Sequence, residues 1–417
     1  MSNPLSVCVL GLGYVGLPTA AIISNRGIPV TGVDTRQTVV DTIANGETPI
    51  VEPGLDVLVK SAITSGYLKT ELKPVPADVF ILAVPTPFKE ANVPDLSYLE
   101  SAIASVAPVL SPGNLVILES TSPVGTTEKI EAWIANHRPN LAPVNTPKEP
   151  KVHIAHSPER VLPGRVLIEL VDNDRVIGGL TPTCAQKAAE FYKLFVQGTC
   201  HITSARTAEL VKLAENAYRD TNIAFANEMS LVCEELGIDV WEMRELANRH
   251  PRVDILLPGP GVGGHCIAVD PWFIVNSARN STPLLQAARH VNDLKPQRVT
   301  ETILSEAKRA SARAICCLGL SYKADIDDLR ESPSIDIVDM VSRRFEGTLF
   351  IVEPHIEVLP KDLQGAANLT LTGLRDGLEH SDVVVLLTDH QDFRSIPAND
   401  LKGKRIIDTR GVWRSIG

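Results

Sequence analysis

The sequence predicts an α/β fold in which two Rossmann-type, doubly wound parallel-sheet domains are joined by a long central helix. Three observations lead to this prediction. A glycine-rich turn directly follows the first apolar strand, apolar runs alternate with helical stretches in the first and last thirds of the chain, and residues 203–236 contain neither proline nor glycine. Strands that alternate with helices form parallel sheets. We expect domains at residues 1–200, 201–300 and 301–417.

The composition argues against several classes of protein. The 417 residues are 44% hydrophobic and 22% charged, which is enough apolar material for two or three cores. The formal net charge of −10 argues against nucleic acid and against an acidic membrane surface as partners. No apolar run approaches the ~18 residues of a membrane span, and the N-terminus lacks the pattern of a secretory signal. We therefore expect a cytoplasmic protein that binds small molecules.

The seven cysteines are scattered along the chain and include no CxxC pair. A disulfide framework normally shows an even number of cysteines, and a structural zinc site normally shows paired ones. We therefore expect neither a disulfide framework nor a bound metal.

The first predicted strand, residues 6–10, runs into a glycine-rich turn and then into a helix-compatible stretch. This is the GxGxxG pattern in the context that binds a dinucleotide. Gly11 permits the tight turn, Gly13 lets a pyrophosphate approach the backbone, and Gly16 allows the helix to pack closely on the strand. The residues of this turn that we expect to bind the cofactor are Gly11, Gly13, Tyr14, Val15 and Gly16.

A second predicted strand, residues 28–33, ends in Asp34, eighteen residues after Gly16. An acid at this distance meets the adenine ribose hydroxyls in dinucleotide-binding proteins, and its charge would repel a 2′-phosphate. The expected cofactor is therefore NAD and not NADP, although the nearby Arg36 favours the opposite. The alternative is a glycine turn and a surface acid that serve no cofactor.

Two further predicted strands, residues 78–84 and 114–119, end in polar and proline-containing turns. Ligands of doubly wound sheets bind beyond the carboxyl ends of the strands. Pro85, Thr86 and Thr121 occupy those ends, so we expect them in the cofactor site. Turn formation is the alternative role for each.

The central helix is expected to be mostly buried, because apolar or small residues recur along it at helical spacing. Lys212 and Asn216 lie one turn apart, so they share a face with each other and with Asp220. A solvated stripe is the alternative, but a cation and an amide at this spacing can bind one oxygen as it becomes negative. The recurring residues are Leu210, Leu213, Ala214, Ala217, Thr221, Ala224, Ala226 and Met229.

Glycine and proline fix the backbone path of residues 258–271, where Cys266 and Asp270 lie four residues apart. Positions without side chains let a ligand approach the main chain, so this loop can hold a substrate against a thiol nucleophile. The alternative is a connecting loop with one buried cysteine. Lys212 and Asn216 would supply the oxyanion partner that the Cys266 thiol requires.

After residue 294 strands and helices alternate again, but without a GxGxxG turn. Residues 313–318, 382–388 and 405–409 are predicted strands. The last third is therefore expected to bind a different nucleotide, with Lys323 and Arg330 facing its phosphates. Ordinary surface charge is the alternative for these two side chains.

Four motifs together resemble the UDP-glucose/UDP-mannose dehydrogenase family over essentially the whole chain. They are GLGYVG at 11–16, KLAEN at 212–216, GGHCIAVD at 263–270 and GLSYKADIDDLRESP at 319–333. Residues 156–164 and 261–273 are most similar to the members that act on UDP-N-acetyl-D-mannosamine. The resemblance implies an N-terminal NAD domain, a central helix used in dimerisation, a C-terminal UDP-sugar domain, and a homodimer or larger homo-oligomer.

The same resemblance implies the roles of individual residues. The catalytic residues would be Cys266 as nucleophile with Lys212, Asn216, Asp270, Thr121 and Glu159. The substrate would be bound by Glu159, Arg160, Lys212, Asn216, Arg252, Gly263 and Lys323, with Arg252 reaching into the neighbouring subunit's site, while Thr121 and Arg330 contact the cofactor. Pro163 stands where the UDP-glucose enzymes carry a second Glu, so water activation would fall more to Asp270 and Glu159.

The implied reaction is a four-electron, NAD-dependent oxidation of the sugar C6 through a thiohemiacetal and a thioester on Cys266. UDP-N-acetyl-D-mannosamine is the expected substrate, and its C2 epimer UDP-N-acetyl-D-glucosamine is the alternative. A two-electron hydroxy-acid dehydrogenase would have no use for Cys266, and a zinc alcohol dehydrogenase would need more ligands than His265 and Cys266. A non-catalytic sensor of NAD and a nucleotide sugar is the alternative from another class.

Overall fold

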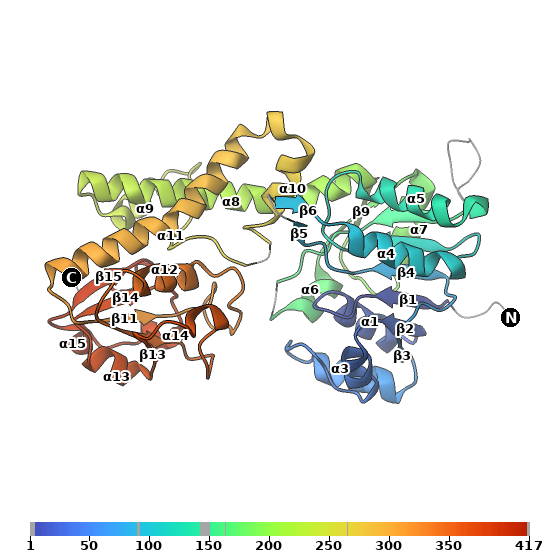
Figure 1. The fold of residues 1–417 in the computed structure, drawn as a ribbon. Coiled ribbons are helices and arrows are strands. Elements are labelled where there is room, and N and C mark those ends of the chain that lie inside the picture. The colour runs from blue at the N-terminus through green and yellow to red at the C-terminus, as the bar shows by residue number, and fades with distance from the viewer. Residues whose placement is uncertain (1–4, 90–91, 142–150, 163, 265, 415–417) are drawn as a thin grey trace. The chain divides into compact units, whose positions relative to one another are not determined.

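The computed structural model describes residues 5–89, 92–141, 151–162, 164–264 and 266–414. The chain folds into two compact units, the first made of residues 1–215 and 272–278 and the second of residues 216–271 and 279–417. Each unit contains a large sheet with helices packed on both faces (Figure 1). The α/β class predicted from the sequence is confirmed, whereas the three domain boundaries stay a prediction.

The sheet of the first unit has eight strands in the order β10-β9-β8-β7-β4-β1-β2-β3. Val7 of β1 lies opposite Val30 of β2 on one side and Val79 of β4 on the other. The paired strands are parallel except for β8 and β9, which run antiparallel. The strands are β1 (Val7–Leu10), β2 (Val30–Val33), β3 (Leu68–Glu71), β4 (Val79–Leu82), β7 (Leu115–Leu118), β8 (His153–His156), β9 (Arg175–Gly179) and β10 (Cys200–Ser204), with a separate hairpin of β5 (Phe88–Lys89) and β6 (Val93–Pro94). The first four predicted strands correspond to β1, β2, β4 and β7.

Successive side chains of β1 enter two different cores. Val7 and Val9 pack with α1, α2, α3, α6 and α7, whereas Cys8 and Leu10 pack with α4 and α5. This follows from the alternation of side chains along a strand, and it explains why the sequence is apolar without interruption there. The helices are α1 (Gly16–Asn25), α2 (Gln37–Ala44), α3 (Leu55–Thr64), α4 (Ser97–Val106), α5 (Thr126–His137), α6 (Val166–Asp172) and α7 (Pro182–Tyr192).

The sheet of the second unit has five parallel strands in the order β13-β12-β11-β14-β15. Ile315 and Cys317 of β11 face a core shared with α11 and α12, and Cys316 and Leu318 face a core shared with α13, α14 and α15. The strands predicted in this part of the chain are β11, β14 and β15. The elements are β11 (Ala314–Leu318), β12 (Thr348–Val352), β13 (Leu369–Leu371), β14 (Val383–Leu386), β15 (Arg405–Asp408), α9 (Val240–Ala247), α11 (Pro283–Arg309), α12 (Pro333–Ser342), α13 (Leu374–Glu379), α14 (Gln391–Arg394) and α15 (Ala398–Leu401).

The predicted central helix is α8 (Ala205–Leu236), whose residues up to 215 belong to the first unit and whose remainder belongs to the second. Leu213, Ala217 and Ala224 are buried as predicted. Leu210 and Ala214 are exposed, so the prediction of burial is wrong for these two. The reason is that α8 has a second apolar side that the single chain leaves open to solvent. Its large exposed apolar residues are Leu210, Tyr218, Phe225, Val232 and Leu236.

A buried ion pair ties α8 to α11 within the second unit. Arg289 Nη1 donates to Asp220 Oδ1 at 2.6 Å, and Asn292 Nδ2 donates to the same oxygen at 2.8 Å. Burial raises the pKa of Asp220, and the positive charge of Arg289 partly offsets that rise. Asp220, which shares a helical face with Lys212 and Asn216, is therefore a structural residue.

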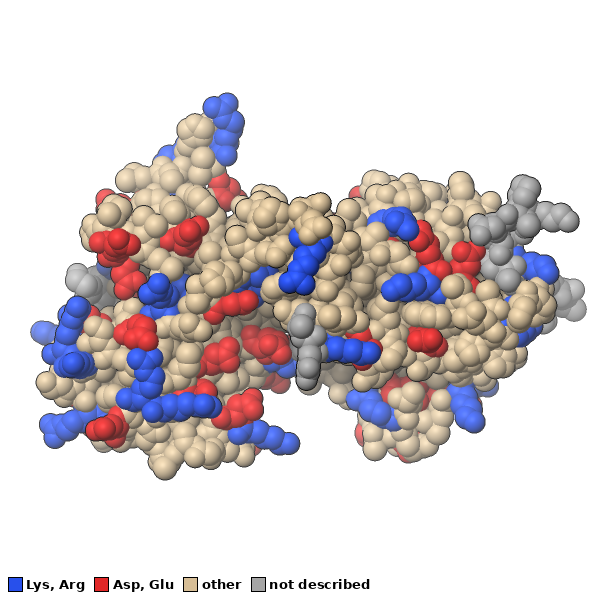
Figure 2. Space-filling model, turned by 45° about the horizontal axis from the view of Figure 1, so that its top comes forward, with Lys and Arg blue, Asp and Glu red and all other residues tan. Residues whose placement is uncertain are grey.

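The surface carries charges of both signs. On the face seen in Figure 2, lysine and arginine side chains are interspersed with aspartate and glutamate over each unit. Within the described ranges, no helix is both long enough and apolar enough to cross a membrane.

Replacing Arg289 should destabilise the second unit. We expect Arg289→Met to lower the free energy of unfolding by about 3–5 kcal/mol, because the Asp220 carboxylate stays buried without its cation. Arg343→Met is the matched control, since this arginine is 74% exposed in its pair with Asp339. Such exposed pairs contribute about 0–1 kcal/mol. Urea unfolding followed by circular dichroism measures both variants, and equal midpoints would contradict the assignment.

Candidate active site

The glycine-rich turn between β1 and α1 uses each of its glycines differently. Gly11 has a φ of +90°, and a Cβ there would lie 2.5 Å from the carbonyl oxygen of Ala83. A Cβ on Gly16 would lie 1.8 Å from the carbonyl oxygen of Gly11. A Cβ on Gly13, by contrast, would have no atom within 4 Å. The space over Gly13 at the N-terminus of α1 therefore fits the approach of a pyrophosphate, and Tyr14 and Val15 lie in the same turn.

Asp34 follows β2 and faces the glycine turn. Its carboxylate accepts the backbone N–H of Leu12 at 3.2 Å and both the backbone N–H and Nε of Arg36, at 3.0 and 3.2 Å. Burial alone would raise the pKa of Asp34, but the hydrogen bonds from Arg36 and Leu12 bring it below its usual range. Asp34 is thus an anionic acceptor beside the turn, and its charge holds Arg36.

The carboxyl ends of β4 and β7 are joined by side-chain hydrogen bonds. Thr86 Oγ1 donates to the carbonyl oxygen of Thr121 at 2.5 Å, and Ser120 Oγ donates to the carbonyl oxygen of Val84 at 2.6 Å. Pro85 lies between the two bonded residues of the β4 end. The structure therefore brings together Pro85, Thr86 and Thr121, as the sequence predicts for one edge of the sheet.

The loop after β8 holds Glu159 in a buried position. Its carboxylate accepts the backbone N–H of Arg160 at 2.7 Å and Nη2 of Arg175 at 3.1 Å. The guanidinium of Arg160 donates to Glu215 at 2.8 Å and also to the carbonyl oxygen of Asp174. Arg175 was not predicted from the sequence. The signal was present, because an arginine that opens an apolar strand needs an anionic partner.

Lys212 lies close enough to the end of β8 to act on a histidine there. Burial and the positive charge of Lys212 lower the pKa of His156 to about 3. His156 is therefore neutral, and Lys212 is a cationic group near this end of the sheet. Glu159, Thr121 and Lys212 all belong to the first unit, whereas Asn216, Cys266 and Asp270 belong to the second.

In the second unit the cysteine loop is tied to α8. Asn216 Nδ2 donates to Asp270 Oδ2 at 2.6 Å, and the backbone N–H of Asp270 donates to the carbonyl oxygen of Cys266 at 2.8 Å. Asp270 is 2% exposed and opens α10 (Asp270–Ser277), while Cys266 is exposed. The structure therefore brings three of the predicted catalytic residues together.

Exposure separates Cys266 from the other cysteines. Burial raises the pKa of Cys8 to about 11 and that of Cys317 to about 12. Burial also raises the pKa of Cys200, which is half-buried. Because the thiolate is the reactive form, these thiols are poor nucleophiles. The remaining cysteines, Cys184, Cys233 and Cys316, are buried as well.

The cysteine loop packs on residues 319–333 through its glycines. Gly264 has a φ of +82°, and a Cβ there would lie 2.8 Å from the ring of Tyr322. A Cβ on Gly263 would lie 2.5 Å from the carbonyl oxygen of Glu331. The two missing side chains thus make room for the neighbouring loop of the same unit. The substrate contact of Gly263 stays a prediction.

Residues 319–333 present the two predicted phosphate-facing cations. Lys323 is exposed, and Arg330 donates from Nε and Nη2 to the carboxylate of Asp328 at 2.8 and 2.6 Å. Ser332 accepts the backbone N–H of Ser334 and so caps α12, which begins at Pro333. The helix start fixes the C-terminal end of this loop.

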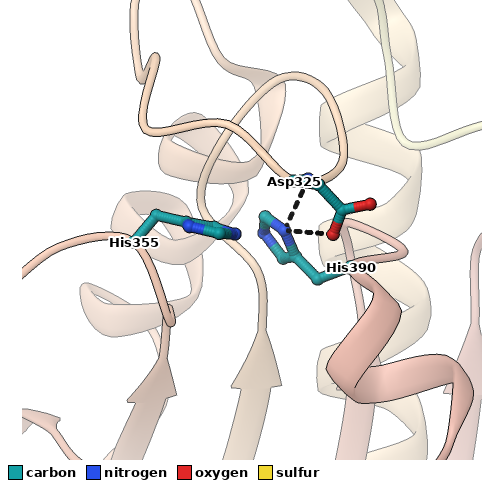
Figure 3. A group of neighbouring side chains, drawn as sticks. All are labelled: Asp325, His355 and His390. Carbon is teal, nitrogen blue, oxygen red and sulfur yellow. Dashed lines mark hydrogen bonds and ion pairs between the residues drawn. The ribbon is translucent and has the colours of Figure 1, made fainter.

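A histidine cluster anchors the first half of the loop (Figure 3). His390 Nδ1 accepts the backbone N–H of Asp325 at 2.9 Å, and His390 Nε2 lies 3.1 Å from a carboxylate oxygen of Glu353. Asp325, His355 and His390 place potential ligand atoms within 4.8 Å of one another, which is compatible with a metal ion. Both ring nitrogens of His390 are already used, so the geometry fits an anchor better than a chelate.

Three positions that the sequence analysis names add no geometry to the site. Arg252 is exposed in the segment that follows α9, so its reach toward a neighbouring subunit stays a prediction. Pro163 lies outside the described residues, as does His265. The absence of a second glutamate at position 163 remains a fact of the sequence.

The sequence matches three domain descriptions of the UDP-glucose/GDP-mannose dehydrogenase family. They are the NAD binding domain over residues 5–196, the central domain over residues 206–294 and the UDP binding domain over residues 316–415. This is the family that the sequence motifs indicated, with GDP-mannose as its second named substrate.

Curated relatives and solved structures extend this similarity over whole chains. An NDP-N-acetyl-D-galactosaminuronic acid dehydrogenase of Ralstonia nicotianae is 54% identical over 98% of this chain and 96% of its own. A UDP-N-acetyl-D-mannosamine dehydrogenase of Escherichia coli is 51% identical over 98% of this chain and 99% of its own. The structure of a UDP-D-ManNAc dehydrogenase from Pyrococcus horikoshii superposes with a TM-score of 0.85 at 38% identity, covering 98% of this chain and 96% of the other.

The open space at Gly13 predicts that a substitution there affects cofactor binding and not the stability of the fold. We expect Gly13→Ala to leave the melting temperature unchanged and to weaken NADH binding at least about tenfold, because the new methyl group occupies only the ligand's approach. Gly11→Ala is the comparison variant. It should cost about 1–3 kcal/mol of stability, because alanine is strained at a positive φ. Fluorescence titration and thermal melting test this, and wild-type affinity in Gly13→Ala would overturn it.

Proposed function

We propose that this chain, which belongs to the UDP-glucose/GDP-mannose dehydrogenase family, oxidises C6 of a UDP-N-acetylhexosamine to the carboxylate, with UDP-N-acetyl-D-mannosamine as its substrate. As a family member it is an NAD-dependent UDP-sugar dehydrogenase with an NAD binding domain and a UDP binding domain. The observation that carries the proposal is the exposed thiol of Cys266 on a loop fixed by the bond between Asn216 and Asp270.

The proposed chemistry uses Cys266 as a covalent nucleophile. Bound NAD would supply the hydride acceptor for each of the two oxidation steps. Between them the Cys266 thiolate adds to the C6 aldehyde and forms a thiohemiacetal, whose oxidation gives a thioester. Water then hydrolyses the thioester, so the sugar leaves as a carboxylate and the thiol is restored. A thiolate suits both steps because it is a good nucleophile and a good leaving group.

Lys212 and Asn216 support the oxyanion in this proposal. They lie one turn apart on the uninterrupted helix α8, so an ammonium and an amide project from one helical face. Loss of one such donor typically costs about 2.7–4 kcal/mol of transition-state stabilisation. Asp270 lies on the loop of the thiol and Glu159 in the first unit, and we assign both to water activation with Thr121 beside the cofactor.

NAD is the proposed cofactor in preference to NADP. Asp34 is an ionised acceptor close to the backbone of Leu12 in the dinucleotide turn. Arg36, the residue that favours NADP, already donates to the Asp34 carboxylate. A 2′-phosphate would have to approach that carboxylate, which its own charge disfavours. The role of Arg330 as a cofactor contact belongs to the same proposal.

The acetamido group of the sugar is supported by the names of the relatives. The relatives from Escherichia coli and from Ralstonia nicotianae carry N-acetyl sugars in their names, at 51% and 54% identity. The second name makes a UDP-sugar of the N-acetyl-D-galactosamine series a further candidate. UDP-N-acetyl-D-glucosamine, the C2 epimer of UDP-N-acetyl-D-mannosamine, remains the third candidate substrate. We assign Arg160, Arg252, Gly263 and Lys323 to substrate binding.

A homodimer is the proposed assembly. Tyr218, Phe225 and Val232 recur every seven residues on α8 and are 70%, 49% and 39% exposed. Apolar side chains at this spacing form one stripe along a helix, and such stripes are typical of helix association. A second copy of the chain would cover the stripe, and Arg252 of that copy is then available to a neighbouring site.

Replacing the thiol tests the covalent mechanism. We expect Cys266→Ser to abolish steady-state release of two NADH per sugar, because an ester is a far poorer intermediate than a thioester. Cys200→Ser is the control, since that thiol is half-buried on β10 and is assigned no role. NADH absorbance against UDP-sugar consumed is the measurement. Wild-type turnover in Cys266→Ser would remove the mechanism.

The choice of sugar is tested by comparing catalytic efficiency with four UDP-sugars under identical conditions. We expect the catalytic efficiency with UDP-N-acetyl-D-mannosamine to exceed that with UDP-glucose by at least about tenfold. The reason is that protein groups that hydrogen-bond the acetamido group would lose their partners when a hydroxyl replaces it. UDP-N-acetyl-D-glucosamine and UDP-N-acetyl-D-galactosamine complete the panel. Better use of either would move the assignment to that sugar, and equal use of UDP-glucose would refute the acetamido assignment.

The dimer is tested by placing a charge in the stripe. We expect Phe225→Glu to shift the protein to the monomer, because a buried, unpaired carboxylate in the interface costs several kcal/mol. Val358→Glu is the control, since Val358 is 68% exposed in the second unit and lies outside α8. Light scattering coupled to size-exclusion chromatography gives the mass. A monomeric wild type, or a dimeric Phe225→Glu, would contradict the proposal.

A further inference from the structure

One guanidinium in the first unit serves two buried carboxylates. Arg175 Nη2 lies 3.1 Å from Glu159 Oε2, and Arg175 Nη1 lies 4.0 Å from Glu119 Oε1. The guanidinium also stacks over the ring of Tyr192 at 4.7 Å. Nε and Nη1 of Arg175 are buried and have no hydrogen-bond partner in the part of the chain that the structure describes. The side that faces Glu119 therefore keeps unused donor capacity.

Glu119 is a buried acid that the proposed reaction does not use. It follows β7 directly and precedes Ser120, two residues before Thr121. Tyr192 donates its hydroxyl to Glu119 Oε1 at 2.7 Å, and Thr19 of α1 donates to Glu119 Oε2 at 3.4 Å. The acid is thus held by α1, α7 and β9 at once, and its oxygens face groups that are fixed.

We propose that Arg175 is a positioning residue that fixes the Glu159 carboxylate for reaction, and that Glu119 competes with Glu159 for the same guanidinium. The inference deepens the proposed function, because it rests on Glu159 acting at the substrate. Glu159 keeps one bond from the backbone N–H of Arg160 at 2.7 Å, so Arg175 is the partner whose loss would free its other oxygen.

The charge state of Glu119 decides how the guanidinium is shared. Burial, with the negative charge of Glu159, raises the pKa of Glu119 to about 7, against the opposing effects of Arg175, Tyr192 and Thr19. Burial also raises the pKa of Tyr192 well above its usual value, so its hydroxyl stays a donor. Below about pH 7 Glu119 is neutral and Arg175 serves Glu159. Above it, the ionised Glu119 draws Nη1 and weakens the hold on Glu159.

A double-mutant cycle on the full-length enzyme tests the positioning role. We expect Arg175→Met to lower kcat at least about tenfold with a smaller change in KM, and Arg175→Lys to recover part of the loss. In a Glu159→Gln background, Arg175→Met should change kcat by less than about twofold, because its partner is already gone. Independent, multiplicative losses would overturn the proposal, as would wild-type kcat in Arg175→Met.

Glu119→Gln tests whether Glu119 competes with Glu159 for Arg175. This variant keeps the ion pair between Arg175 and Glu159. We expect the ratio of its kcat to that of the wild type to rise as the pH increases through about 7, because glutamine cannot ionise and draw Arg175 away. When the same ratio is measured in a Tyr192→Phe background, where Glu119 has lost one donor, the rise should occur at higher pH. A ratio that is independent of pH would refute the competition. Both variants keep the test open if Arg175→Met fails to fold.

An infrared titration separates this inference from the proposed function, because it needs no turnover. The wild type should show a protonated carboxyl band that disappears as the pH rises through about 7, and Glu119→Gln should lack it. Glu52→Gln is the matched control, since Glu52 is also buried and accepts the backbone N–H of Gly164 and Val166 at 2.9 and 2.8 Å. If the band persists in Glu119→Gln, the inference fails even in an active enzyme. If no UDP-sugar is oxidised but the band behaves as expected, the proposed function fails, while the assignment of the titrating carboxyl to Glu119 holds.

Discussion

The Asp270 carboxylate sets the main constraint on the second unit, because a buried anion must be hydrogen-bonded to be tolerated. Asn216 meets that need at 2.6 Å, and the backbone N–H of Asp270 closes a turn on the Cys266 carbonyl. The exposed thiol is therefore positioned by a residue four places further along the chain and by one face of α8. Any shift of α8 along its axis would move Asn216, and through Asp270 it would move the loop that carries Cys266.

Residues 319–333, on which the cysteine loop packs, are equally constrained. Gly264 must be glycine, because a Cβ at that position would meet the ring of Tyr322 and because its φ is positive. Tyr322 belongs to residues 319–333, whose start is held by a deeply buried carboxylate. Glu353 accepts the backbone N–H of Leu320 at 2.7 Å, and His390 contributes a further bond. Burial would raise the pKa of Glu353, but the bonds from His390 and Leu320 bring it below its usual range. The cysteine loop thus packs on residues 319–333, which the Glu353 carboxylate holds in place through its hydrogen bonds.

The sequence predicted those parts of the molecule that follow from local chemistry. The strands were found because each is apolar along its whole length, and the glycines of residues 11–16 because spacing and context coincide. The sequence did not predict the long-range pairs of charged side chains around the candidate site. Arg175 and Glu119 lie 56 residues apart in the sequence, so no local periodicity connects them. The burial of α8 was overestimated at Leu210, because its periodicity does not distinguish a core from a face that another chain would cover.

The Arg175 cluster shows why such residues are hard to predict and still informative. A buried ion pair often contributes little net stability, since desolvation of both charges offsets their attraction. Two carboxylates around one guanidinium leave an uncompensated negative charge when both are ionised, and here Glu119 lies 4.0 Å from Nη1, beyond hydrogen-bond distance. An apolar replacement of the whole cluster would fold at least as readily on these grounds. Its position, between α1 through Thr19 and the loop after β8 through Glu159, instead supports the proposed role of the cluster in placing the Glu159 carboxylate.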